Sequence, residues 1–382
     1  MNFDFTSEQI LLGDSLRRYF SKSYSLSDRS RGMAAPRGFS DEHWQALADM
    51  GVLALNVPEA HGGLASGAGN PLDTLVVMRE MGRGLVVEPA WMSAVVCANA
   101  IALSGNEAQQ AALLPQLADG SSVFALAALE HGARYDVNRV TTTATRADGG
   151  FRLDGRKAVV LHGGQADHLL VTARTSGAVD AADGIAVFIV ECGAKGLRAL
   201  DYATVDGFRG AEVTLDGVVV AETAMLCAAA DGSAVIERTI ELAGAALCAE
   251  ALGIVEALTE ATNEYLKTRK QFGVPIGKFQ SLQHRVADML VAVEQVRAMA
   301  YFAAAKVSLD GRDARKSAIA AARAAVAEAS RFVGKNAVQL HGGMGVTDEL
   351  NVSHYVKRLT MLNQTYGDYE HHLARYAETM AG

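Results

Sequence analysis

The chain has 382 residues, half of them apolar, and a formal net charge of -8. This length favours two or three domains, and the acidic balance argues against nucleic acid as the main partner. No uninterrupted apolar run is long enough to cross a bilayer, and the acidic, amphipathic N-terminus is not typical of a signal peptide. Four scattered cysteines without metal-type pairing are typical of a reducing compartment, so we expect a cytoplasmic protein with no membrane span.

Residues 1–121 carry the signals of a helical N-terminal domain. The stretch from Thr6 to Gln9 offers a helix N-cap ahead of an apolar stripe, and a second start signal at Ser40 leads to a helix that Gly51 closes. Between later elements, residues 56–69 (NVPEAHGGLASGAG) are rich in glycine. No Gly-Lys-Ser/Thr follows this stretch and no strand precedes it, so we interpret it as a connecting loop rather than a phosphate-binding loop.

Residues 122–228 contain short runs rich in β-branched and apolar residues. No helical period separates these runs, which favours a small antiparallel β domain over a doubly wound sheet. No G-x-G-x-x-G follows a strand, so we expect no Rossmann cofactor site. The expected strands cover 123–129, 151–153, 168–173, 185–190 and 213–219. Asp-Gly and Gly-Gly pairs predict turns at 149–150, 154–155, 183–184 and 216–217.

Residues 229–382 return to helical periodicity, with an alanine-rich segment over 316–333 that favours close helix packing. Two long apolar patterns meet at a short connection, where the glycines and the proline of 273–277 break the helix. Arg269 and Phe272 therefore lie at the end of the first long helix, beside the turn. A guanidinium that is always charged, next to an aromatic ring, suits a phosphate-bearing ligand.

Two stretches carry a resemblance to a known family. TRKQFGVPIGKFQSLQHRVADM (268–289) and GKNAVQLHGGMGVTDE (334–349) resemble the acyl-CoA dehydrogenase flavoproteins, and the likeness covers essentially the whole chain. The stretches at 236–253 and 354–377 are similar to the small subunit of pimeloyl-CoA dehydrogenases. The resemblance implies an α+β fold with an N-terminal helical domain, a middle antiparallel β domain and a C-terminal four-helix-type bundle.

The same resemblance implies a function in fatty acid metabolism, as in β-oxidation. Members of the family use FAD to oxidise an acyl-CoA thioester to the trans-2-enoyl-CoA and pass the electrons to an electron-transfer flavoprotein. For this chain the closer match suggests a dicarboxylyl substrate such as pimeloyl-CoA, and Arg134 and Arg152 are open candidates to meet a distal carboxylate. It also suggests a tetramer, either a homo-oligomer or a heterotetramer with a related large subunit.

The resemblance places the flavin ring against two segments of the β domain, 125–136 and 157–164. Leu129 and His162 stand at cofactor-binding positions, but Leu129 replaces the usual threonine, Tyr135 the usual serine and His162 the usual asparagine. Backbone amides can still bind the ring. Each lost side-chain hydrogen bond is expected to weaken flavin binding by about 1 kcal/mol.

Further cofactor positions of the family lie in the helical C-terminal part, where they reach a flavin held by a neighbouring subunit. Glycines there let backbone approach a phosphate closely, although a Gly-Gly pair on its own also fits a helix stop. The residues that match are Arg269, Phe272, Gln280, Gln339, Gly342, Gly343 and Tyr369.

The catalytic base is the main departure from the family. A carboxylate removes the α-proton of the acyl-CoA, most often from a Tyr-Glu-Gly-Thr motif near the C-terminus. Gly367 stands at that glutamate position in this chain. Other members carry the glutamate on the long helix near Ala243, and Glu241 is two residues away, a rotation of roughly 200° on a helix. Glu241 is the candidate base, while Glu237, Glu250 and Asp368 are alternatives that more often serve as solvated or salt-bridged carboxylates.

Two other classes of function stay open. One is a catalytically silent partner subunit that completes the flavin site of a related large subunit, as Gly367, Leu129 and Tyr135 favour. The other is oxidation of a different substrate by flavin and oxygen. A metal site at Asp368, Glu370, His371 and His372 is not expected, because no second cluster of ligands is evident.

Overall fold

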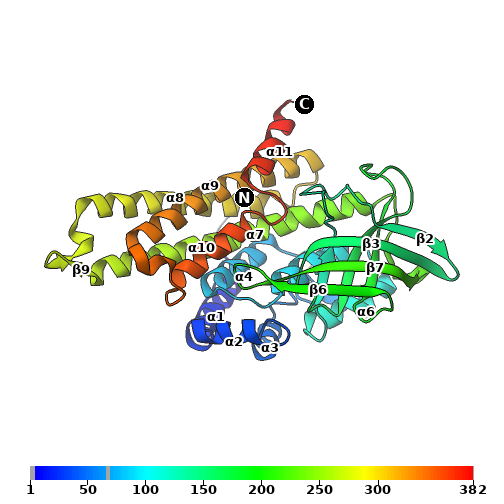
Figure 1. Cartoon of the computed structure of the whole chain (residues 1–382), viewed down its shortest axis with the longest axis horizontal. Helices are drawn as coiled ribbons and strands as arrows, with labels where there is room; N and C mark the ends of the chain where they lie inside the picture. The colour runs from blue at the N-terminus through cyan, green and yellow to red at the C-terminus, as the bar shows by residue number, and fades with distance from the viewer. Residues whose placement is uncertain (1–4, 66–68, 382) are drawn as a thin grey trace. The chain divides into compact units, whose positions relative to one another are not determined.

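The structure, a computed structural model, describes residues 5–65 and 69–381 (Figure 1). These residues form two compact units. The helical unit comprises the described residues of Met1–Arg29, Pro71–Val86 and Gly244–Gly382, and the sheet unit those of Ser30–Asn70 and Val87–Ala243. The α+β fold class is confirmed, whereas the domain boundaries at 121/122 and 228/229 stay a prediction.

Helices make up the N-terminal segments of both units. The side chain of Thr6 accepts a hydrogen bond from the backbone of Gln9, and Gln9 returns one, so the predicted N-cap is a full capping box. Ser40 caps the third helix, and Gly51 follows that helix with φ +77°. The elements are α1 (Ser7–Ser23), α2 (Leu26–Ala34), α3 (Asp41–Asp49), η1 (Glu59–His61), α4 (Pro71–Gly84), the π-helix η2 (Trp91–Cys97), α5 (Ala98–Ser104) and α6 (Glu107–Ala118).

The sheet unit is built on an eight-stranded sheet whose strand order is β6-β7-β3-β2-β4-β5-β8, with β1 paired to β4. Most neighbours are antiparallel, as predicted, but β1 pairs with β4 in parallel and β2 meets β4 in parallel at one residue pair. The strands are β1 (Phe124–Ala127), β2 (Thr143–Ala147), β3 (Gly150–Leu161), β4 (His168–Arg174), β5 (Ile185–Glu191), β6 (Leu197–Ala203), β7 (Arg209–Ala221) and β8 (Met225–Cys227), with a short η3 (Glu222–Ala224) between the last two.

Two of the four predicted turns are wrong. β3 continues through Asp154-Gly155 and β7 through Asp216-Gly217, and the pairing of β3 with β7 shifts register between Leu153 and Gly155. The carboxylate of Asp154 accepts a hydrogen bond from the amide of Gly217 at 2.8 Å. The two Asp-Gly pairs therefore face each other across a β-bulge, where glycine tolerates the backbone angles that the extra residue requires.

The C-terminal helices belong to the helical unit apart from the start of α7. The elements are α7 (Gly232–Thr268), β9 (Lys270–Gln271), β10 (Val274–Pro275), η4 (Ile276–Lys278), α8 (Gln280–Lys306), α9 (Arg312–His341), η5 (Gly342–Val346), α10 (Asn351–Leu362) and α11 (Tyr369–Ala381). Figure 1 shows α8 and α9 side by side along their length. α7 is the one described helix long and apolar enough to cross a membrane, but 89% of its most apolar window is buried inside the protein, as in a core helix.

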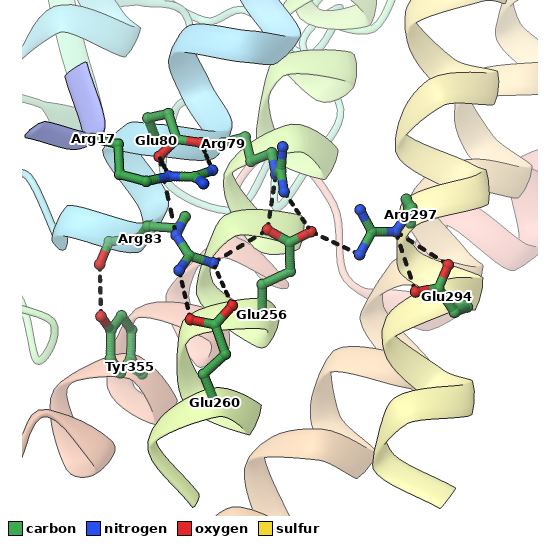
Figure 2. Close-up of polar contacts among 9 residues, drawn as sticks. All are labelled: Arg17, Arg79, Glu80, Arg83, Glu256, Glu260, Glu294, Arg297 and Tyr355. Atoms are coloured by element: carbon green, nitrogen blue, oxygen red, sulfur yellow. Dashed lines mark hydrogen bonds and ion pairs between the residues drawn. The ribbon is translucent and has the colours of Figure 1, made fainter. Parts of the chain in front are cut away.

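Charged side chains link three helices of the helical unit, α4, α7 and α8 (Figure 2). Glu256 on α7 is almost fully buried and accepts hydrogen bonds from Arg79 on α4 at 2.8 and 3.0 Å. Arg297 on α8 lies 3.0 Å from the same carboxylate, and Arg83 lies 3.4 Å from it. Arg83 also binds Glu260. Since a buried carboxylate is stable only when paired, this network fixes how α4, α7 and α8 pack.

Candidate functional site

A tight hairpin presents two of the predicted cofactor residues to solvent. α7 ends at Thr268, and β9 pairs with β10 through a two-residue turn at Phe272 and Gly273. Both turn residues have positive φ, +54° and +80°, which a type I′ hairpin turn requires. Positive φ is costly for a residue with a bulky side chain. Phe272 is nonetheless held in this conformation with 89% of its surface exposed, and Arg269 is exposed beside it.

The first residues of α8 complete this corner of the helical unit. Phe279, the N-cap of α8, packs edge-on against Phe272 with ring centroids 6.0 Å apart. Gln280 follows as the first, exposed residue of α8. The structure therefore brings three predicted residues, Arg269, Phe272 and Gln280, to one exposed corner.

The end of α9 supplies a second surface of glycine backbone. α9 ends at His341, and Gly342 follows with φ +60° while its amide donates to the carbonyl of Gln339. A Cβ built on Gly342 or Gly343 meets no atom within 4 Å, so their backbone faces open space. This geometry leaves room for a phosphate to approach the main chain.

The side chain of His341, the last residue of α9, joins these two surfaces. The His341 ring is buried, hydrogen-bonds the carbonyl of Ala337 at 2.9 Å and stacks on Tyr265 with centroids 4.4 Å apart. Burial lowers its pKa, which favours the neutral imidazole. Tyr265 lies one helical turn before Arg269, so the stack connects the end of α9 to the end of α7.

These residues fit the adenine and pyrophosphate half of FAD. The exposed guanidinium of Arg269 can pair with phosphate, the exposed ring of Phe272 can stack on a base, and the open backbone at Gly342 and Gly343 can approach closely. Tyr369 stands apart from this set as the first residue of α11, where it is half-buried. Its assignment to the cofactor stays a prediction.

The two predicted ring-binding segments meet in the sheet unit. The amide of Ala158 donates to the carbonyl of Leu129 at 2.8 Å. Next to this contact the Lys157 ammonium lies 2.6 Å from the Glu130 carboxylate, with both side chains buried. No local pattern in the sequence predicts this ion pair, because a lysine with no exposed surface cannot be recognised without the packing around it.

His162 is placed differently from what a side-chain contact to the flavin would need. Its side chain is buried, edge-on to the Phe208 ring at 5.5 Å, and its amide donates to the carbonyl of Arg209 at 2.9 Å. Its φ of +57° and that of Val159, +51°, mark an irregular backbone between them. Leu129 is half-buried and offers no side-chain hydrogen bond. Any contact of this segment with the ring therefore falls to the backbone.

The candidate base Glu241 lies in the sheet unit with its side chain buried. Its Oε2 lies 3.4 Å from Nη1 of Arg238, one helical turn earlier. At Ala243, the alternative family position, the indole of Trp91 donates to the backbone carbonyl at 3.4 Å and both residues are buried. Glu237 accepts a hydrogen bond from Asn138 at 3.4 Å.

Gly367 not only lacks a carboxylate but stands where a side chain has no room. It has φ +135°, and a Cβ built on it comes within 2.6 Å of His372 Nε2 and 2.7 Å of His371 Cδ2. His372 is held in place by Arg323, whose Nε donates to Nε2 at 3.3 Å. Burial, the charge of Arg323 and the neighbouring His371 lower the pKa of His372 to about 2, so this imidazole is neutral.

Other charged residues named from the sequence have structural partners. Glu250 binds Arg358 at 2.6 and 2.9 Å, buried, and is therefore not available as a base. Asp368 accepts a hydrogen bond from the amide of His371 at 2.9 Å, as at a helix start. Arg152 pairs with Asp154 at 2.9 Å, and Arg134 lies over the ring of Tyr135. Over 5–65 and 69–381 no three histidine, cysteine, aspartate or glutamate residues are grouped to hold a metal.

Comparison with known proteins gives one consistent result. The chain matches the models of the acyl-CoA dehydrogenase N-terminal domain over residues 6–121, the middle domain over 125–218 and the C-terminal domain over 230–381. It is 32% identical to the short-chain-specific acyl-CoA dehydrogenase of Megasphaera elsdenii, over 81% of this chain and 82% of the relative.

Two solved structures are similar over nearly their full length. A variant of the steroid ACAD Tcur3481–Tcur3483 has a TM-score of 0.86 at 30% identity, with 98% of each chain covered. The ChsE4–ChsE5 complex from Mycobacterium tuberculosis has a TM-score of 0.89 at 27% identity, with 100% of this chain and 99% of that chain covered.

Proposed function

The chain belongs to the acyl-CoA dehydrogenase family and uses FAD, and from this premise we propose that it oxidises its acyl-CoA at a flavin site shared between subunits of an oligomer. The observation that carries the proposal is the exposed corner of Arg269 and Phe272. A phenylalanine with 89% of its surface exposed, in a costly backbone conformation, is expected to gain a partner on assembly. The partner we assign is the adenine and pyrophosphate of a flavin seated in a neighbouring subunit.

Each part of this corner has a distinct task. Arg269 neutralises phosphate charge, Phe272 stacks on the adenine, and the backbone of Gly342 and Gly343 allows the pyrophosphate to come close. Gln280 and Gln339 are exposed amides that can donate at the rim of the same surface. FAD supplies the redox chemistry when bound, and this chain's residues fix its position.

We assign the proton abstraction to Glu241. Its carboxylate is buried, and it is the candidate that lies nearest to the position on the long helix where other members of the family carry their base. The alternatives are weaker, because Glu250 is held by Arg358 and position 367 has no room for a side chain. A Glu241→Gln variant should keep FAD and lose the bleaching of the flavin by substrate.

Substrate, electron acceptor and partner follow from sequence resemblance. Pimeloyl-CoA and other dicarboxylyl-CoA esters are the first substrates to test, with an electron-transfer flavoprotein as acceptor in the cytoplasm. A related large subunit is the proposed partner if a heterotetramer forms, and the similarity to a chain of the ChsE4–ChsE5 complex supports a partner of a different kind. Arg152 and Arg134 are engaged within the chain, so we assign no residue to a distal carboxylate.

A second candidate function is favoured by Leu129 and Tyr135 in the sequence and, in the structure, by Gly367. Since His371 and His372 occupy the space of the usual glutamate, the chain also fits the supporting half of a site whose base belongs to a related subunit. This chain would then contribute its Arg269–Phe272 corner and leave the chemistry to its partner.

One experiment separates the two functions. The chain is purified alone and with a co-expressed related subunit, and flavin absorbance is followed anaerobically as acyl-CoA esters are added. If the chain alone bleaches, it is a dehydrogenase in its own right. If bleaching occurs only when the related subunit is present, the chain completes a site whose base belongs to that subunit.

The corner is tested in the same preparations. Arg269→Ala is expected to weaken FAD binding by about tenfold, since a charge-assisted pair to phosphate is lost, and to leave the melting temperature of the flavin-free protein unchanged. Lys270→Ala, an exposed neighbour without a predicted role, is the matched control. Equal FAD affinity in both variants would contradict the assignment.

A further inference from the structure

The two ring-binding segments of the sheet unit are not neighbours in the strand ladder. β3 lies between β7 and β2, and among the strands of the described residues β1 pairs with β4 alone. The segment that follows β1 and the segment at the end of β3 are therefore not held at a fixed spacing by ladder hydrogen bonds between them. Other contacts must set that spacing.

A buried ion pair lies at the point where the segments meet. Glu130 follows directly after Leu129, and Lys157 precedes Ala158, the two residues whose backbones are hydrogen-bonded at 2.8 Å. The Lys157 ammonium lies 2.6 Å from Glu130 Oε1 and donates to the hydroxyl of Thr172 at 2.9 Å. Neither charged side chain has more than 2% of its surface exposed.

The carboxylate of Glu130 is also bound on its other side. It accepts hydrogen bonds from the amides of Thr141 and Thr142 at 2.7 and 3.1 Å, and from the hydroxyl of Thr141. Burial opposes its charge, but the Lys157 ammonium and these donors outweigh it and lower the pKa of Glu130. The pair is therefore satisfied on both sides, which is the condition for a stable buried ion pair.

A bulge makes this arrangement possible. The pairing of β3 with β7 shifts register between Lys157 and Val160, and Val159 within the shift has φ +51° with half of its surface exposed. Positive φ is unusual for a β-branched residue and persists only where surrounding contacts enforce it. At this bulge the side chain of Lys157 is buried and the amide of Ala158 donates to the carbonyl of Leu129. The ion pair and the strained backbone therefore occur at the same place and are expected to depend on each other.

We propose that Glu130 and Lys157 are a positioning pair for the cofactor. The pair sets the spacing between 128–136, the part of segment 125–136 that follows β1, and segment 157–164, and thereby the geometry of their flavin-binding amides. This inference rests on the proposed function, because it takes these segments as the ring site. It adds that a pair buried beneath the site controls flavin binding without offering a side chain to the flavin.

The test compares two buried ion pairs of similar burial. Lys157→Met removes one charge below the ring site and leaves a side chain of similar length. Arg358→Met does the same to the Glu250–Arg358 pair of the helical unit, whose side chains are 6% and 7% exposed. Both variants should lower the melting temperature, because each leaves a buried carboxylate without its partner.

Only Lys157→Met should change the ring site. In flavin-free protein we expect faster amide hydrogen exchange within 128–136 and 157–164, and in FAD titrations about tenfold weaker binding together with a shift of the flavin absorption band. Arg358→Met should leave all three unchanged. If Lys157→Met lowers the melting temperature as Arg358→Met does but keeps the exchange, affinity and absorption of the parent protein, the pair is structural only and the inference is wrong.

Two further results keep the inference separate from the proposed function. Should Lys157→Met fail to fold, Glu130→Gln retains the shape and part of the hydrogen bonding, and the same comparisons apply to it. Should the parent chain bind no FAD alone or with a related subunit, the shared-site function falls. The exchange comparison in flavin-free protein then still decides whether the pair controls these segments.

Discussion

At the scale of single residues, the absence of a Cβ atom at Gly367 decides how the surrounding side chains pack. Glycine is the residue that fits there, because its φ of +135° lies outside the range of side-chain-bearing residues and a Cβ would enter the ring of His372. That ring cannot move aside easily, since it is buried and bound to Arg323. Arg323 in turn donates to the carbonyls of Leu362 and Thr365 at 2.8 and 2.9 Å, so the whole loop before α11 is fixed around the glycine.

A glutamate placed at this position is therefore not expected to act as a base. In a Glu241→Gln background, Gly367→Glu should fail to restore flavin bleaching and should lower the stability by roughly 1–3 kcal/mol, the usual cost of backbone strain and steric overlap. Urea unfolding and anaerobic titration measure the two effects. Gly149→Ala, at a glycine with φ +76° and open space around it, is the control for strain without overlap. Restored bleaching at undiminished stability would show that the loop can open.

The residues of the site differ in how far the sequence predicts them. Arg269 and Phe272 were placed correctly at the turn after a long helix, because helix-breaking residues and a charged, aromatic pair are local signals. Lys157 is buried against Glu130, 27 residues earlier, and Gly367 is crowded by His372, 5 residues later. Both contacts depend on tertiary packing that no local sequence pattern encodes. The assignment of His162 to the cofactor stays a prediction that its buried side chain does not favour.

At the scale of elements, the helical unit depends on Glu256. The carboxylate has three guanidinium partners from α4 and α8, so it is the point where three helices are joined (Figure 2). Removing one partner of a buried ionic network is far more costly than removing a surface pair, because the remaining charges stay buried without compensation.

Glu256→Gln should accordingly destabilise the protein by about 3–5 kcal/mol. Glu264→Gln, on the same helix, removes an exposed pair with Lys267 and should cost no more than about 1 kcal/mol. Both are measured by urea unfolding followed through helical circular dichroism. A Glu256→Gln variant as stable as Glu264→Gln would mean that the arginines are solvated rather than dependent on this carboxylate.

Strands were harder to predict than helices in this chain, for reasons visible in particular elements. The long helices over 232–268, 280–306 and 312–341 carry an apolar period over many turns, which leaves little ambiguity. β2 and β6 were missed because their side chains are largely exposed, and a short strand with little burial lacks a period-2 pattern. The Asp-Gly pairs at 154 and 216 have the composition of turns, and only the opposite strand shows that they form a bulge.

At the scale of the whole molecule, the residues proposed for the cofactor site belong to both units. The segments proposed for the flavin ring and the proposed base Glu241 belong to the sheet unit, and the exposed corner of Arg269 and Phe272 belongs to the helical unit. If each corner serves a neighbour's flavin, one complete site needs two chains. Closed symmetric oligomers achieve this reciprocally, since each chain gives and receives the same contact.

Mixing two defective chains tests this arrangement. Arg269→Ala removes the guanidinium that is proposed to bind the flavin of the neighbouring chain. Glu241→Gln removes the proposed base of the chain's own site. In a mixed dimer, the site on the Arg269→Ala chain has its own Glu241 and receives an intact Arg269 from the other chain, while the second site carries both defects. At an FAD concentration near the dissociation constant of the parent protein, Arg269→Ala alone should have low flavin occupancy and low activity, and Glu241→Gln alone should be nearly inactive. Doubly tagged mixed oligomers should regain activity at about half of the sites. No recovery in purified mixed oligomers would mean that Arg269 and Glu241 of one chain serve the same flavin, or that the complementary residues belong to a different subunit. Repeating the assay with a related large subunit separates these two cases, because only in the second does the added subunit restore activity to the Glu241→Gln chain.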